Sequence, residues 1–160
     1  MWAIISLLVE NKTGILFKVT NLFRSRNFNI ESISVGVTEN PDYSRMTITT
    51  NSDEKRVTQI VKQLDKMIDT VDVKHLDENK TVYRELCLFM IKISKASDSM
   101  EINQIATAYG GKVHDVKKES IMVELTATPH QIQAFEELIK PFGIIDVART
   151  GVAALQRSGS

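Results

Sequence analysis

The sequence is poor in residue types whose scarcity excludes whole classes of protein. Its single cysteine, Cys87, among 160 residues excludes an intramolecular disulfide framework and is typical of a reducing compartment. The 20 acidic and 20 basic residues leave no net charge, whereas broad nucleic-acid binding needs an excess of Lys and Arg. The first apolar run, AIISLLV, is too short to span a membrane and follows no basic leader. We therefore expect a cytoplasmic protein that binds neither nucleic acid nor membrane.

Groups suited to catalysis or metal binding are also scarce. His75, His114 and His130 lie in three separate segments, without the spacing of a zinc site and without a second cysteine. Cys87 lies in an apolar stretch and is predicted to be a packed strand residue, because a reactive thiolate needs a polar, electropositive setting. The carboxylates, Asp69 among them, are interpreted as solvated surface charge. The sequence therefore predicts no catalytic residue, no metal ligand and no cofactor in this chain.

The sequence does contain a repeated pattern, because the same order of predicted strands and helices occurs in both halves. In the first half, periods of two and of 3.6 residues predict strand, helix, strand, strand, helix and strand. These predicted elements cover residues 2–10, 15–27, 30–37, 44–50, 52–68 and 70–76. The second helix is predicted to begin at a capping box of Asn51 and Glu54 and to bury Ile68 in its last turn. The polar stretch LDENKT, at 76–81, is interpreted as a linker.

The second half repeats the order with ELCLFMIKI, KVHDV, SIMVELTA and GIIDVAR as strands. Its helices are predicted to begin at Ser97 or Asp98 and at Thr128, where Pro129 follows. A β-α-β-β-α-β unit with amphipathic helices forms a four-stranded antiparallel sheet covered on one face. The fold class is therefore α+β, with two ferredoxin-like domains at 1–77 and 78–160. The uncovered sheet faces are partly apolar, so we expect a homo-oligomer.

The junction VENKTGIL, at 9–16, is the main candidate site. Gly14, Ile15 and Leu16 occupy the first turn of a helix, whose N–H groups lack intrahelical acceptors and suit a carboxylate. Asn11 and Asn29 can offer amide oxygens to the ammonium of an amino acid. Alternatively, the two asparagines are turn and cap residues and Gly14 only shapes the turn. The residues alone leave both interpretations open. An RNA-binding module, the third alternative, lacks the aromatic residues it needs on its central strands.

A family resemblance favours the first interpretation. In the first half it rests on LLVENKTGILFKVTNLFRSRNFNIESISVG, SRMTI and DEKRVTQIVKQLDKMIDTVDV. In the second half it rests on YRELCLFMIKI, GGKVHDV and DVARTGVAAL. With E-N-x-x-G-x-L and R-x-x-N-I-E-S at this spacing, the chain resembles the small regulatory subunits of acetolactate synthase, also called acetohydroxyacid synthase. The N-terminal domain of that family is an ACT domain. One departure is Thr150, where the family more often has serine.

The resemblance implies a regulatory subunit and not an enzyme. Such subunits bind the large catalytic subunit, raise its activity and confer feedback inhibition by valine, leucine or isoleucine, usually valine. Thiamine diphosphate, Mg²⁺ and FAD would be held by that partner and not by this chain. The effector would lie between the ACT domains of a homodimer. One protomer would contribute Asn11, Gly14, Ile15 and Leu16, and the other Asn29 and Ile30. An ACT-type sensor that regulates a different enzyme or transcription is the alternative.

Overall fold

A computed structural model describes residues 1–159, which form two compact units. The first unit contains Met1–Tyr83 and the chain from Val152 onward, and the second contains Arg84–Gly151. The sequence predicted one boundary, between residues 77 and 78. In the structure the first unit extends to Tyr83, six residues beyond the predicted boundary, and it also includes the chain from Val152 onward. The reason is that the two strands that join the units, Thr81–Lys92 and Ile144–Gln156, are both longer than their predicted segments.

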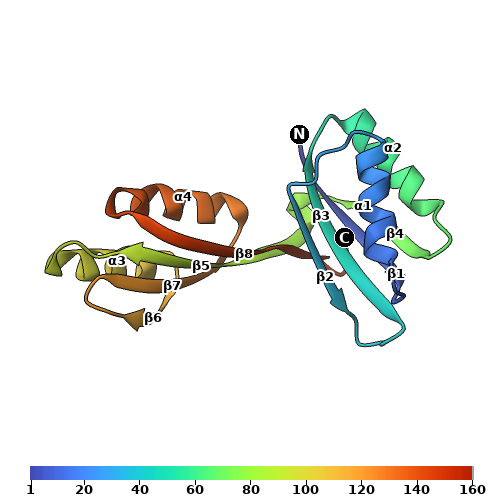
Figure 1. The fold of residues 1–160 in the computed structure, drawn as a ribbon. Helices are drawn as coiled ribbons and strands as arrows, with labels where there is room; N and C mark the ends of the chain where they lie inside the picture. The colour runs from blue at the N-terminus through green and yellow to red at the C-terminus, as the bar shows by residue number, and fades with distance from the viewer. Residues whose placement is uncertain (160) are drawn as a thin grey trace. The chain divides into compact units, whose positions relative to one another are not determined.

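The predicted order of elements is present twice, which confirms the α+β class and the two ferredoxin-like units (Figure 1). The first set is β1 (Trp2–Glu10), α1 (Ile15–Ser25), β2 (Ser32–Val37), β3 (Tyr43–Asn51), α2 (Glu54–Asp65) and β4 (Thr70–Leu76). The second set is β5 (Thr81–Lys92), α3 (Ala96–Ala108), β6 (Lys112–Val116), β7 (Ser120–Ala127), α4 (Pro129–Ile139) and β8 (Ile144–Gln156). Short 3-10 helices at Glu78–Lys80 and Lys140–Phe142 precede β5 and β8.

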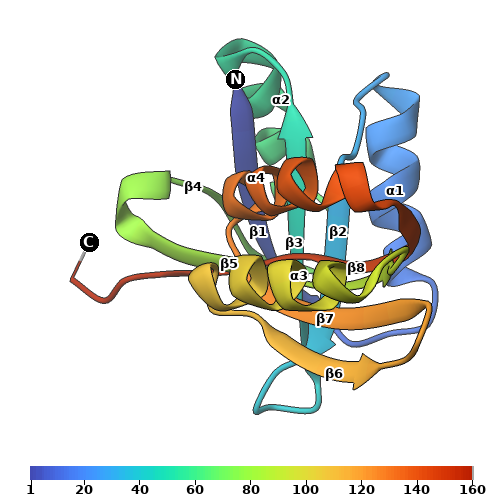
Figure 2. The same cartoon turned by 90° about the vertical axis from the view of Figure 1, so that its left-hand side faces the viewer.

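Each unit has a four-stranded sheet with its two helices on one face. The strand orders are β2-β3-β1-β4 and β6-β7-β5-β8, so the first strand of each unit is central and the second is an edge. In the first sheet β1 pairs antiparallel with both β3 and β4, with Trp2 opposite Asn51 and Glu10 opposite Tyr43. Helices α1 and α2 lie on the same side of the first sheet, and α3 and α4 on the same side of the second (Figures 1 and 2).

The core of the first unit lies between its sheet and its helices. The predicted faces supply it: Ile15, Val19 and Phe23 from α1 are buried, as are Val57, Ile60 and Leu64 from α2. Periodicity therefore located both faces correctly. These side chains pack against a shared set of strand residues: Ala3, Ile5, Leu7, Val9, Met46 and Ile48.

Both predicted ends of the second helix were wrong. Asn51 is still part of β3, and the cap is Asp53, whose side chain accepts a hydrogen bond from the Arg56 N–H at 2.8 Å. At the other end, α2 stops at Asp65 and the chain turns, with the Met67 N–H bonded to the carbonyl of Leu64. Ile68 is consequently outside the helix and 92% exposed.

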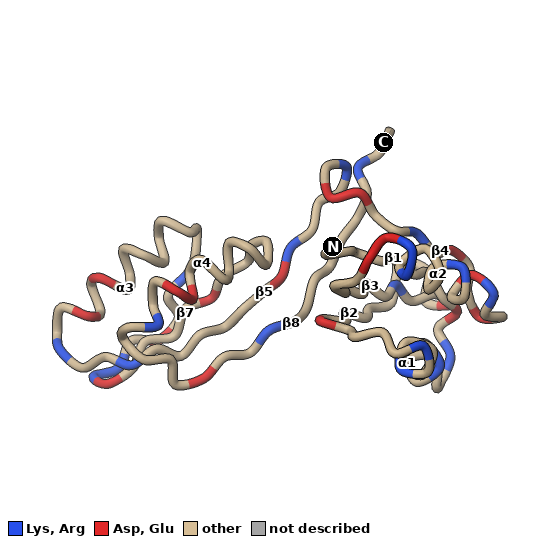
Figure 3. The backbone as a smooth tube through the Cα atoms, turned by 90° about the horizontal axis from the view of Figure 1, so that it is seen from above, with Lys and Arg blue, Asp and Glu red and all other residues tan. Residues whose placement is uncertain are grey.

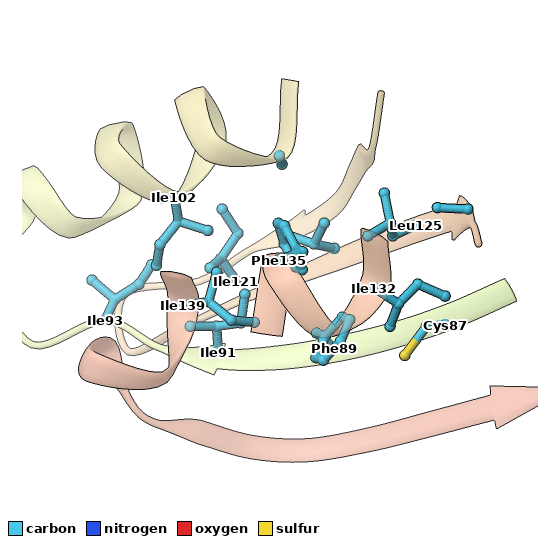
Figure 4. Close-up of a cluster of buried hydrophobic side chains, with 13 residues drawn as sticks. Cys87, Phe89, Ile91, Ile93, Ile102, Ile121, Leu125, Ile132, Phe135 and Ile139 are labelled. Atoms are coloured by element: carbon cyan, nitrogen blue, oxygen red, sulfur yellow. The ribbon is translucent and has the colours of Figure 1, made fainter. Parts of the chain in front are cut away.

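The second core lies between α3, α4 and their sheet (Figure 4). Phe135 of α4 packs at its centre, with its ring centroid 5.2 Å from that of Phe89 and 5.7 Å from that of Tyr109. Cys87 is fully buried in this core, and burial raises the pKa of its thiol to about 11. The prediction of a packed, unreactive strand cysteine is confirmed.

Of the two predicted helix starts in the second unit, the one at Thr128 is confirmed and the one at Ser97 or Asp98 is wrong, because the cap of α3 is Lys95. Thr128 is the cap of α4, with Pro129 in the first turn, and its hydroxyl accepts from the Gln131 N–H at 3.3 Å. Helix α3 begins at Ala96, and Asp98, inside the first turn, accepts from the N–H groups of Ser94 and Lys95. Those two bonds lower the pKa of Asp98, the Ser94 bond most strongly.

The face of the first sheet opposite its helices is not as open as predicted. Strand β8 was expected to end at Arg149 but runs to Gln156, and Val152 and Ala154 pack against Ile4 and Leu76. Trp2 and Tyr83 flank this small cluster, with their ring centroids 5.5 Å apart. The chain's own last strand therefore covers part of a face that the sequence suggested was free for association.

Candidate functional site

Gly14 sets the geometry of the junction between β1 and α1. It caps the helix in the left-handed region, at φ +84° and ψ −2°, where residues with a Cβ are strained. A Cβ added at Gly14 would meet nothing within 4 Å, so the backbone conformation, and not crowding, favours glycine. The space at that position beside the helix start is open.

The first turn of α1 presents free backbone donors. The Ile15 N–H reaches the carbonyl of Lys12 at 3.4 Å, and the Lys18 N–H bonds to the carbonyl of Gly14 at 3.1 Å. Between them, the N–H groups of Leu16 and Phe17 have no acceptor within residues 1–159. Such donors at a helix N-terminus, with the positive end of the helix dipole, suit a carboxylate.

Asn11 has a structural role in the free chain. Its N–H donates to the carbonyl of Asp42 at 2.7 Å, and its side-chain amide donates to the carbonyl of Pro41 at 3.1 Å. Its Oδ1 accepts from the hydroxyl of Ser44 at 3.1 Å. These three bonds hold the turn between β2 and β3, and the first residues of β3, to the beginning of the junction after β1. The interpretation of Asn11 as a turn residue is therefore supported, while its role toward a ligand stays a prediction.

Asn29 and Ile30 lie just before β2, away from the helix start. The carbonyl of Asn29 accepts from the Thr50 hydroxyl at 2.6 Å, while its exposed side chain makes no hydrogen bond within the described part of the chain. Ile30 is half-buried against the first core. Thr50 lies at the sheet end that holds Trp2 and Asn51, whereas the junction follows Glu10 at the other end. Within a single chain, the predicted site residues therefore lie in two separate groups.

A buried carboxylate beside the junction was missed by the sequence analysis. Asp69 is only 5% exposed and accepts from the ammonium groups of Lys18 at 2.9 Å and Lys12 at 3.5 Å. Its carbonyl also accepts from the Glu10 N–H at 2.9 Å. The Lys18 hydrogen bond is the main cause that lowers the pKa of Asp69. The interpretation as solvated charge was wrong, because this residue fastens the first turns of α1 to the loop before β4.

Exposed apolar side chains adjoin the candidate site. On α1, Leu16 is 44% and Phe17 71% exposed, and on β2 the side chains of Val35 and Val37 are 46% and 60% exposed. Strand β2 is also an edge of the sheet, so its outer N–H and C=O groups have no strand partner in residues 1–159. Apolar side chains beside an unpaired edge are typical of a surface that associates with another chain.

The other candidate groups do not assemble into a site of their own. His114 pairs with Glu124 at 2.7 Å on neighbouring strands of the second sheet. Within residues 1–159, no three His, Cys, Asp or Glu side chains are grouped closely enough to hold a metal ion. The helices in this range include none with the length and hydropathy of a membrane span. Lys and Arg are interspersed with Asp and Glu along both units (Figure 3).

Comparison with known proteins identifies the family. Residues 5–72 match the family model described as the AHAS small subunit-like ACT domain, and residues 84–158 match that of the small subunit of acetolactate synthase. A probable acetolactate synthase small subunit of Methanothermobacter thermautotrophicus is 44% identical over 96% of this chain and 92% of its own length. The chain belongs to the acetolactate synthase small-subunit family. Its first unit is accordingly an ACT domain, as the resemblance implied.

Other members support the same assignment over nearly the full length. The Bacillus subtilis acetolactate synthase small subunit is 42% identical over 98% of this chain and 91% of its own. The crystal structure of the Thermotoga maritima small subunit, 36% identical, superposes with a TM-score of 0.90 and covers 100% of this chain and 99% of that one. As a small subunit, the chain is the regulatory component of acetolactate synthase and not the catalytic one.

Proposed function

We propose that this small subunit raises the activity of the large catalytic subunit and makes it sensitive to branched-chain amino acids, valine first among them. The effector would bind between the ACT domains of two copies of the chain. The observation that carries this proposal is the separation of the six site residues into two groups at opposite ends of one sheet, joined by an exposed edge strand.

Antiparallel pairing of the β2 edges of two copies would bring the two groups of site residues together. A two-fold axis beside the middle of β2 brings the start of one strand opposite the end of the other. Val37, at the end of β2, is opposite Ser44 of β3, and Ser44 bonds to Asn11 at the junction. Asn29 and Ile30 of one copy would therefore approach the α1 start of the other. The exposed Val35 and Val37 side chains would be covered in the same step.

The chemistry of the paired groups fits an aliphatic amino acid. The carboxylate would accept from the free N–H groups of Leu16 and Phe17, and the open space beside Gly14 allows its approach. Amide oxygens of Asn11 and of the other copy's Asn29 would accept from the ammonium, at less desolvation cost than a buried carboxylate. Leu16 and Ile30 are apolar neighbours for a valine, leucine or isoleucine side chain.

Regulation would follow from linkage between the effector and the subunit assembly. Effector binding favours one arrangement of the dimer, and the catalytic subunit responds to that arrangement. Coupling of this kind is typically about 1–3 kcal/mol, or roughly a 5- to 150-fold change in apparent affinity. We further propose that thiamine diphosphate, Mg²⁺ and FAD reside in the catalytic partner and not here, and that the assembly is cytoplasmic.

Reconstitution with the catalytic subunit tests the proposal. Valine titrations would compare the wild-type chain with Gly14→Asp, which places a negative charge at the carboxylate position, and with Asn29→His. We expect both variants to lose valine inhibition. Retained stimulation of the catalytic subunit would show that the variants still fold and bind it. Full valine inhibition in both variants would refute the site.

A further inference from the structure

A second concave site lies in the first unit, between the end of α1 and α2. It encloses about 260 Å³ and does not include the effector residues proposed above. Its lining combines cationic, amide and apolar groups: Arg26, Phe28, Arg56, Gln59, Ile60 and Gln63. Arg26 follows the last residue of α1, so the pocket is at the opposite end of that helix from Gly14.

The guanidinium of Arg56 is held in place within this pocket. It lies over the ring of Phe28, 4.6 Å from the centroid, and a guanidinium is attracted to an aromatic face. Its Nη2 donates to the carbonyls of Arg26 at 3.1 Å and Asn27 at 3.0 Å. These contacts use one nitrogen only. The N–H groups of Nε and Nη1 have no acceptor in the described chain.

The positive charge of the pocket has no counter-ion. Neither the guanidinium of Arg26 nor that of Arg56 has a carboxylate oxygen within 4 Å in the described chain. Arg149 of the second unit shows the contrast, because its Nε and Nη2 bond to both oxygens of the buried Glu85. Two guanidinium groups that line one pocket without such a partner are suited to binding an anion.

Two amide side chains complete the donor set. Gln59 and Gln63 are one turn apart on α2, so their side chains share a face of the helix. Neither side chain makes a hydrogen bond within residues 1–159, and both line the pocket. Their NH₂ groups can donate to an oxygen that the guanidinium groups also approach.

We propose that this pocket binds a small oxyanion, a carboxylate or a phosphate, independently of the effector site. Arg26 would contribute a movable guanidinium with both of its forked edges free. Arg56 would contribute a fixed charge and its two unused N–H directions, and the glutamines would contribute amide donors. Phe28 and Ile60 form the apolar part of the pocket lining.

The test is a titration of the ¹⁵N-labelled full-length chain, followed by nuclear magnetic resonance. Sodium phosphate and sodium acetate are added separately, each against sodium chloride at the same ionic strength. We expect saturable shifts at the side-chain amides of Gln59 and Gln63 and at the backbone around Arg26. Arg26→Gln and Gln63→Glu should each weaken binding by about tenfold or more, because each disrupts a charge-assisted contact.

Arg24→Gln is the matched control, since Arg24 is exposed in the last turn of α1, two residues before Arg26, but does not line the pocket. It should leave the titration unchanged. Saturation by phosphate alone, by acetate alone or by both supports the proposal and identifies the class of oxyanion. Shifts no larger than those of chloride, or shifts that persist in both Arg26→Gln and Gln63→Glu, overturn it. The effector proposal is unaffected by either outcome, because valine binding is measured at other residues.

Discussion

At the scale of single residues, Gly14 serves both the fold and the proposed site. Its positive φ makes any side chain costly, while the open space beside it would admit a ligand. The two roles can be separated by two substitutions that share the backbone strain. Alanine adds strain alone, and aspartate adds strain and a negative charge.

We expect Gly14→Ala to lower the free energy of unfolding by about 1 kcal/mol, the usual order for alanine in the left-handed region, and to retain valine binding. Gly14→Asp should lose comparable stability and, in addition, lose detectable valine binding. Urea denaturation and isothermal titration calorimetry measure the two quantities. Equal valine affinity in both variants would show that valine does not bind at Gly14.

Asp69 should make the stability of the first unit depend on pH. Its pKa is lowered in the folded state, chiefly by the Lys18 hydrogen bond, so its stabilising effect is present above the ordinary carboxyl pKa of about 3.9. That effect is lost as pH falls through the lower folded-state value. Neither lysine partner is close in the chain, since they are 57 and 51 residues away. The sequence therefore gave no local signal for this burial.

We expect Asp69→Asn to be less stable than the wild type near pH 7, with the difference shrinking as pH falls below 4. Denaturant midpoints at a series of pH values measure it. Asp65→Asn is the matched control, because Asp65 is exposed at the end of α2 and has no ion pair in the described chain. A stability difference for Asp69→Asn that does not change with pH would contradict the account.

At the scale of elements, β2 is the edge strand of the first unit that is proposed to pair with another chain. Its outer edge carries the half-exposed Val35 and the more exposed Val37. The second unit offers a comparison, because β6 is an edge strand of its sheet and Val116 on it is 56% exposed. Only the β2 edge is proposed to pair with another copy of the chain.

Val35→Lys should weaken self-association by about tenfold or more, since charged side chains, lysine above all, block edge-to-edge pairing. Val116→Lys should leave the dimer unchanged. Sedimentation velocity over a dilution series measures both variants. If Val116→Lys dissociates the dimer and Val35→Lys does not, the interface lies on the second unit.

The elements themselves were largely predictable from the sequence. KVHDV and SIMVELTA match β6 and β7 along their whole lengths, because alternate residues such as Ile121, Val123 and Leu125 are buried. The ends of α2 were not predictable in this way. Asn51 and Ile68 both fit a helical pattern locally. In the structure, however, Asn51 pairs with Trp2 in the sheet, and Ile68 follows the turn that ends the helix.

At the scale of the whole molecule, contacts between residues distant in the sequence determine features of the packing that periodicity does not predict. The sequence identified the ferredoxin-like order of each unit, but nothing in VAAL showed that Val152 and Ala154 would pack against Ile4. Similarly, the six candidate residues could be chosen from the sequence and the family resemblance. Their separation into two groups depends on strand register, and only the structure supplies it.

The central claim, that one effector site is built from two copies, can be tested by mixing two variants. Gly14→Asp and Asn29→His homodimers should each fail to bind valine. After co-refolding in equal amounts, each mixed dimer would contain one site with both halves intact. Calorimetry should then recover about a quarter of the wild-type valine capacity, the share expected for random pairing. Recovery of no capacity, with mixed dimers demonstrably present, would contradict a site shared between two chains.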